Sequence, residues 1–164
     1  QKLAESSSSS GATALRVATA NSPAAIKAEA RKIAEVLGTM GRFDAWSKNF
    51  DSLAENLRSR ARAAWPRGKV LAQKMIRPFV EWLGLEIAGE FGPAEPSPAL
   101  VLALAGTRPL LVIDNYHSPS GKPIAETAGA AYVQLINFPG KDGTQTIEDV
   151  FRHNADALIK AAKK

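Results

Sequence analysis

The sequence predicts an α/β fold: a parallel sheet of about four strands with helices on both faces, preceded by a long connecting helix. From residue 66 onward, short apolar segments alternate with helical patterns through turns marked by glycine and proline. In addition, the segment 109–114 contains four consecutive apolar residues, 110–113. A strand without a polar face is typical of a sheet that is buried on both sides, as parallel sheets are.

The first half of the chain predicts two helices. Ser22 can cap free amides and Pro23 suits the first helical position, so a helix is expected from there to Gly38. Over residues 43–64, apolar side chains recur every three or four positions and form one stripe along about six helical turns. Pro66 ends this second helix.

The second half predicts the alternating elements. Strands are expected at 69–73, 85–91, 109–114 and 131–136, and helices at 76–83, 98–105 and around 125–128. Thr146 with Asp149 three residues later predicts a capping box at the start of a last amphipathic helix. The apolar segment 12–18 predicts one further short strand.

Composition excludes several functional classes. The 164 residues and 45% hydrophobic content suit one globular domain with or without an appended segment. The net charge of +5 is spread thinly, and Arg58, Arg60 and Arg62 do not share a helix face, so no nucleic-acid site is expected. There is no cysteine and no apolar run near the ~20 residues of a membrane span. The start at Gln1, without a leader, suits a processed or truncated chain.

A binding site is expected beyond the carboxyl ends of the strands, where open α/β sheets hold their ligands. Polar residues appear there in four turns: 73–75, 90–93, 114–117 and 137–140. In the third turn, Asp114 and His117 directly follow a buried strand and could give an oxygen and a nitrogen to zinc or manganese.

A structural role for these two residues is the alternative. An aspartate at the end of a strand often accepts hydrogen bonds from amides of its own turn, and a single histidine is often a surface residue. Two ligands also cannot close a tetrahedral site, so another group would have to come from elsewhere. From the chemistry of the residues alone, the structural role of Asp114 and His117 is favoured.

Catalytic motifs are not found in the sequence. It contains no Gly-x-Ser-x-Gly, no phosphate-binding glycine loop with lysine and no His-Glu-x-x-His. A small enzyme with Asp114 and His117 as acid and base is therefore a weak hypothesis, because no oxyanion donor or cofactor loop supports the pair. It ranks below the two binding hypotheses described next.

Four segments carry a resemblance to a known family: FVEWLGLE at 79–86, FGPAEPSP at 91–98, LVIDNYH at 111–117 and VQLINFPG at 133–140. They resemble the carboxy-terminal lobe of the zinc- and manganese-binding solute-binding proteins of ABC transporters. The helix over 43–64 resembles the part that follows the family's long rigid helix, which would begin near Ser22. The resemblance extends from about residue 20 to the end of the chain.

The resemblance implies two α/β lobes with a divalent metal between them, captured without catalysis in the periplasm or outside the cell. The loaded protein would dock on a membrane permease and be membrane-associated in that sense. It also implies a division of the chain. Residues 1–20, with the serine run 6–10, would be a linker or the remnant of an amino-terminal lobe, 21–65 the connecting helices, and 66–164 the carboxy-terminal lobe.

The sequence departs from the family pattern in two ways. Most of the amino-terminal lobe, with its histidines, is not in this sequence, and Gln73 followed by Lys74 stands where the carboxy-terminal lobe usually has a histidine. Asp114 is then the carboxylate that carries over, with His117 as an unconventional helper. The first hypothesis is thus a solute-binding protein, or a fragment of one, for metal uptake. The second is a lobe with a degenerate metal site that acts as a structural or protein-interaction subunit, paired with the missing lobe or another protein.

Overall fold

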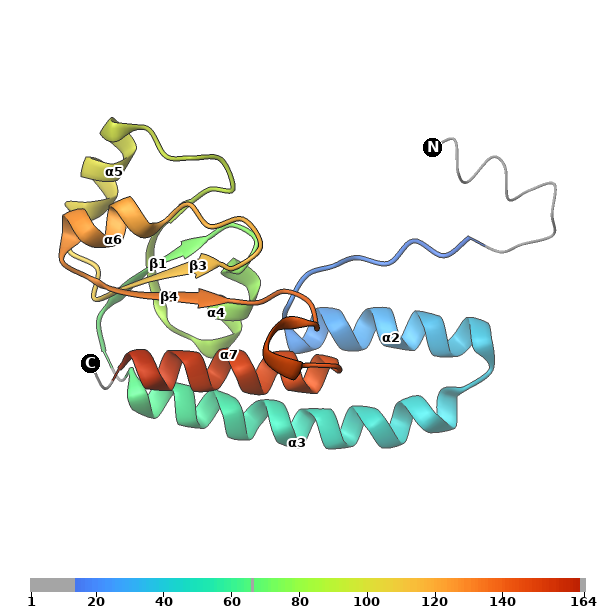
Figure 1. The fold of residues 1–164 in the computed structure, drawn as a ribbon. Helices are drawn as coiled ribbons and strands as arrows, with labels where there is room; N and C mark the ends of the chain where they lie inside the picture. The colour runs from blue at the N-terminus through green and yellow to red at the C-terminus, as the bar shows by residue number, and fades with distance from the viewer. Residues whose placement is uncertain (1–13, 66, 163–164) are drawn as a thin grey trace.

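The computed structural model describes residues 14–65 and 67–162, so the serine run lies outside the described residues (Figure 1). The helices are α2 (Pro23–Leu37), α3 (Met40–Ala64), α4 (Arg77–Leu83), α5 (Pro98–Ala105), α6 (Lys122–Ala128) and α7 (Ile147–Ala161), with a short 3-10 turn at Lys141–Gly143. The strands are β1 (Lys69–Gln73), β2 (Glu86–Phe91), β3 (Leu111–Asn115) and β4 (Ala131–Leu135). Each helix and strand predicted from residue 22 onward is present, with small differences at the ends.

The strand expected over 12–18 is wrong for its described part, because residues 14–20 form neither strand nor helix. Leu15 and Val17 are instead exposed. The apolar pattern there is too short to specify a strand without a neighbouring strand to pair with.

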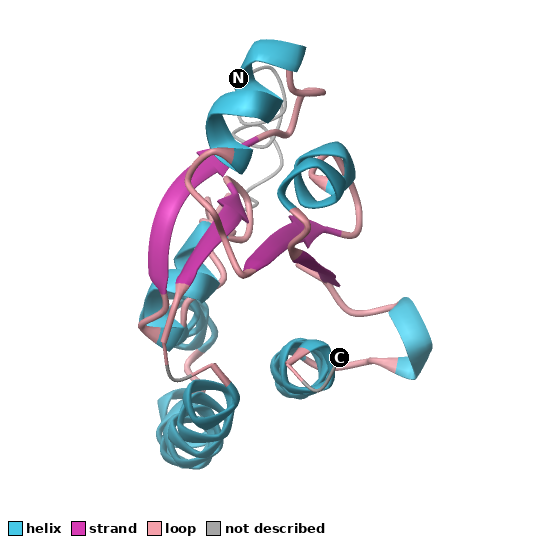
Figure 2. Ribbon diagram, turned by 90° about the vertical axis from the view of Figure 1, so that its left-hand side faces the viewer, coloured by secondary structure: helices cyan, strands magenta, loops and turns pink. Residues whose placement is uncertain are grey.

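The four strands form one parallel sheet in the order β2-β1-β3-β4, as the α/β prediction requires. Alternate residues of the central strand β1 face opposite sides of the sheet. Val70 and Ala72 pack in a core with α3, α4 and α7, whereas Leu71 packs in a second core with α5 and α6. Helices therefore cover both faces (Figure 2).

The amino-terminal part is a helical hairpin. Ser22 caps α2 by accepting a hydrogen bond from the amide of Ala25, and Gly38 ends α2 in the left-handed conformation with φ 65°. The chain then reverses, so that α3 lies beside α2 (Figure 1). The helix that begins after Ser22 has 15 residues, and α3, with 25, is the longer of the two.

Helix α3 shares its core with the sheet. Its residues Phe50, Leu57 and Ala61 are buried in the same cluster as Phe151 of α7 and the strand residues of that face. The predicted boundary between connecting helices (21–65) and lobe (66–164) thus crosses a continuous core, and the division of the chain into domains stays a prediction.

Candidate functional site

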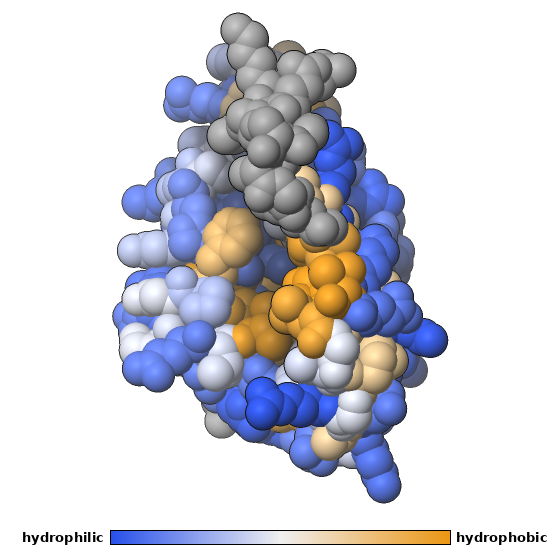
Figure 3. All heavy atoms as spheres, turned by 90° about the vertical axis from the view of Figure 1, so that its right-hand side faces the viewer, coloured by the Kyte–Doolittle hydropathy of each residue, from blue (hydrophilic) through white to orange (hydrophobic). Residues whose placement is uncertain are grey.

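The four polar turns expected at the site lie at one end of the sheet, because the strands are parallel and their carboxyl ends point the same way. Neighbouring turns are joined by main-chain bonds: Lys74 N donates to Phe91 O at 3.0 Å, and Tyr116 N donates to Leu135 O at 2.9 Å. We call this end of the sheet, formed by the turns 73–75, 90–93, 114–117 and 137–140, the rim. Figure 3 shows the face of the molecule that corresponds to the right-hand side of Figure 1, where hydrophobic side chains gather in two groups around a hollow.

Asp114 is fully buried and holds the β3 turn together. Its Oδ1 accepts a hydrogen bond from Asn115 N at 2.8 Å. Its Oδ2 accepts from Ser120 N at 2.9 Å, Gly121 N at 2.7 Å and the Tyr132 hydroxyl at 2.8 Å. Burial of the phenol and its bond to Asp114 raise the pKa of Tyr132. Both carboxylate oxygens are thus used inside the chain, as in the structural alternative.

His117 presents its side chain at the surface of the rim. The imidazole lies in an aromatic row, with ring centroids 5.4 Å from Tyr116 and 5.7 Å from Phe138. Its main-chain N donates to Asn115 Oδ1 at 3.0 Å, and within the described residues the imidazole itself has no hydrogen bond. Lys141 Nζ lies 4.4 Å from the centroid of Tyr116, which adds a positive charge beside the row.

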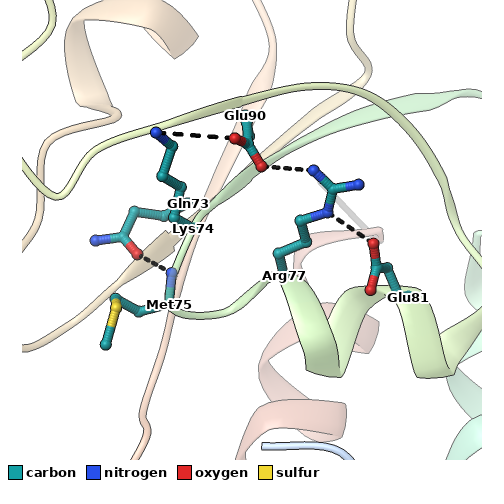
Figure 4. A network of polar contacts seen from close by, with 6 residues as sticks. All are labelled: Gln73, Lys74, Met75, Arg77, Glu81 and Glu90. Carbon is teal, nitrogen blue, oxygen red and sulfur yellow. Dashed lines mark hydrogen bonds and ion pairs between the residues drawn. The ribbon is translucent and has the colours of Figure 1, made fainter. Parts of the chain in front are cut away.

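Gln73, which stands where the resemblance implies a histidine ligand, is buried and joins two turns. Its Oε1 accepts from Met75 N at 2.7 Å (Figure 4), and its Nε2 lies 3.2 Å from Ser118 Oγ and 3.3 Å from Ser118 O. The amide therefore does for the β1 turn what the carboxylate of Asp114 does for the β3 turn.

Asn137 was placed in one of the four polar turns by the sequence analysis, but its buried partner at the rim, Asn21, was missed. Asn21 Nδ2 donates to Asn137 Oδ1 at 2.9 Å and lies 3.3 Å from Asn137 O. This contact fixes the start of α2 against the turn after β4. The available signal was an asparagine in each of two turns, but nothing in the sequence pairs residues 116 positions apart. With Gln73 and Asn115, the pair gives the rim four buried amides, all without charge.

The charged groups beside the β1 turn neutralise one another. Glu90 of β2 accepts from Arg77 at 2.5 Å and lies 3.8 Å from Lys74, while Arg77 also donates to Glu81 (Figure 4). The hydrogen bond from Arg77 lowers the pKa of Glu90, and the bonds to Glu81 and Glu90 raise the pKa of Arg77. Glu90 is thus ionised but already paired.

The side chains of residues 14–65 and 67–162 include no group of three or more His, Asp or Glu close enough together to hold a metal ion. Within the same residues, no helix has the length and apolar character that crossing a bilayer requires.

Solved structures show the same fold. Over 87% of this chain and 61% of its own length, the solute-binding protein FpvC of Pseudomonas aeruginosa, solved with Mn²⁺, superposes with a TM-score of 0.66 at 19% identity. The laminin-binding protein Lmb of Streptococcus agalactiae, an adhesin with metal-transporting activity, gives 0.66 at 18% identity over 88% of this chain and 63% of its own length. The periplasmic zinc-binding protein TroA of Treponema pallidum gives 0.61 at 19% identity over 85% and 60%.

The chain thus has the fold of metal-binding solute-binding proteins and spans 60–63% of the length of these three. No protein-family model matches the sequence, and no curated protein matches it. The names of the three structures describe binding and transport proteins, in agreement with the sequence-based expectation of a binding protein.

Proposed function

We propose that this chain is a lobe of an extracytoplasmic solute-binding protein that serves an ABC transporter for divalent metal uptake, and that it binds without catalysis. The shared fold is the observation that supports it most, since binding proteins crystallised with Mn²⁺ or described as zinc-binding have this sheet and these helices. The polar rim at the carboxyl ends of the strands is where such a lobe would meet its ligand.

In this proposal the metal ion, zinc or manganese, is the cargo, and His117 is the ligand that the lobe contributes. Its imidazole is exposed and has no hydrogen bond within the described residues, whereas Asp114 already accepts four. Asp114 would then position the turn that carries His117 rather than coordinate the ion. The remaining ligands would come from a second body, either an amino-terminal lobe or another subunit, in the periplasm or outside the cell. A permease would receive the ion.

The competing proposal is a lobe that docks on a partner without holding metal. It is favoured by one specific observation, the row of buried amides where an ion would want charged or imidazole ligands. Exposed Met75, Tyr116 and Phe138 around these amides would suit a protein contact.

Calorimetric titration with Zn²⁺ and Mn²⁺ separates the two proposals. If His117 is this lobe's only ligand, the chain should bind zinc weakly, with a Kd of about 0.1–1 mM, because one imidazole leaves most of the coordination to water. His117→Ala should abolish that binding. His153→Ala, the matched control on α7, should leave it unchanged.

Each other result decides against the metal-binding role as proposed. No heat of zinc binding at about 1 mM would favour the docking lobe. Binding at about 1 μM or tighter would mean a complete site within the chain, whereas the proposal gives this lobe one ligand, His117. Weak binding that is lost in His153→Ala would place the ion between α7 and the turn at Asp142 instead of on His117.

A further inference from the structure

Strand β4 is an open edge of the sheet. In the order β2-β1-β3-β4 it has a neighbour on one side only. Ala131 N donates to Leu110 O at 3.0 Å, and Leu135 O accepts from Tyr116 N at 2.9 Å, so these residues direct their main-chain groups toward β3. In a parallel ladder, alternate residues direct these groups to opposite sides of the strand. Tyr132 and Gln134 therefore direct their N–H and C=O groups outward, and the described residues place no strand beside them.

A groove of about 790 Å³ runs along this edge between β4 and the last turns of α7. Small residues line much of it, which leaves room for another main chain. The groove is bordered by Gly129, Ala130, Ala131, Tyr132, Val133, Gln134, Lys141, Ala157, Lys160 and Ala161. Figure 2 shows α7 as the helix that ends near the label C, with the sheet above it.

The charge along the groove has one sign. Lys141 comes from the turn after β4 and Lys160 from α7, and no acidic residue lines the groove. Lys141 lies 3.2 Å from Asp142, while Lys160 is exposed and has no ion pair with any described residue. The groove thus combines unpaired strand groups with an unmatched ammonium.

We propose that β4 binds an extended acidic peptide segment of a partner protein, which adds to the sheet as a fifth strand. Strand addition at a free edge supplies main-chain hydrogen bonds, and the groove side chains then select the sequence. Carboxylates of the segment would lie near Lys160 and Lys141. A second copy of this chain fits less well, because pairing two such edges would bring their lysines together.

The test uses the whole chain and labelled peptides of about six residues, the length that spans the strand. A peptide that alternates glutamate and valine should bind in fluorescence anisotropy, and one that alternates lysine and valine should not. Lys160→Glu should weaken binding of the acidic peptide by about tenfold or more. Lys48→Glu, a charge reversal at an exposed position of α3 that does not line the groove, is the matched control and should change the affinity little.

N-methylation of alternate peptide amides tests the strand geometry without altering the protein. It removes donors for the Tyr132 and Gln134 carbonyls and leaves the carboxylates in place, so binding should fall by about tenfold or more in at least one of the two methylation registers. Equal affinity for methylated and unmethylated peptides would mean simple attraction to a basic surface and would overturn the proposal. So would absence of binding at about 1 mM, or an equal loss in Lys48→Glu and Lys160→Glu.

Discussion

Asp114→Ala is expected to lower the free energy of unfolding by about 3 kcal/mol, because several buried donors would lose their acceptor. Oδ2 alone accepts from the amides of Ser120 and Gly121 and from the hydroxyl of Tyr132. These groups lie in the turn before α6 and in β4, so the loss would loosen two neighbouring elements. Urea denaturation followed by circular dichroism measures the change.

Asp156→Asn is the matched control for that substitution. Asp156 is exposed on α7 and pairs with Arg60 at 3.0 Å, so its loss should change stability by no more than about 0.5 kcal/mol. Asp114→Asn should fall between the two, since one amide oxygen can still accept while the new NH₂ group faces a donor. If Asp114→Ala unfolds at the same urea concentration as Asp156→Asn, Asp114 does not hold the turn.

Phe151→Ala should destabilise the chain by about 3–5 kcal/mol, the usual cost of removing a fully buried ring. Phe151 joins α7 to the rest of the core through three aromatic contacts. Its ring centroid lies 5.2 Å from that of Phe50, 5.3 Å from Phe79 and 5.3 Å from Trp82. The cavity would lie between α7 and the two helices α3 and α4, so the packing of α7 against both would be weakened.

Phe151→Leu and Phe138→Ala calibrate this result. The first keeps most of the volume and should cost less than alanine. The second removes a ring that is 50% exposed at the rim and should cost about 0.5 kcal/mol or less. A melting temperature for Phe151→Ala equal to that of Phe138→Ala would contradict the packing described here.

The helices and strands could be predicted because their signals are local. The cap at Ser22, the left-handed Gly38 and the capping box at Thr146 all appear in the structure as the sequence indicates. The spacing of apolar residues predicted the buried stripe of α3 in the same way. The order of the strands has no such local signal, so the exposed edge at β4 could not be anticipated.

The site was harder to predict because its contacts join distant positions. The sequence left two roles open for Asp114, and the hydroxyl of Tyr132, 18 residues away, is among the groups that occupy its oxygens. Gln73 was recognised as a departure from the family pattern, but its bonds to the turn at Ser118 depend on how β1 lies beside β3. The contact between Asn21 and Asn137 depends on where α2 begins relative to β4.

The proposed function requires that His117, in a turn held by Asp114, reaches an ion shared with a second body. A two-dimensional amide NMR titration with Zn²⁺ tests it most directly, since it locates even weak binding. Shifts are predicted first at His117 and in the turn that contains Phe138. Shifts that begin instead at His153, whose imidazole lies 4.0 Å from Asp142, would contradict the claim.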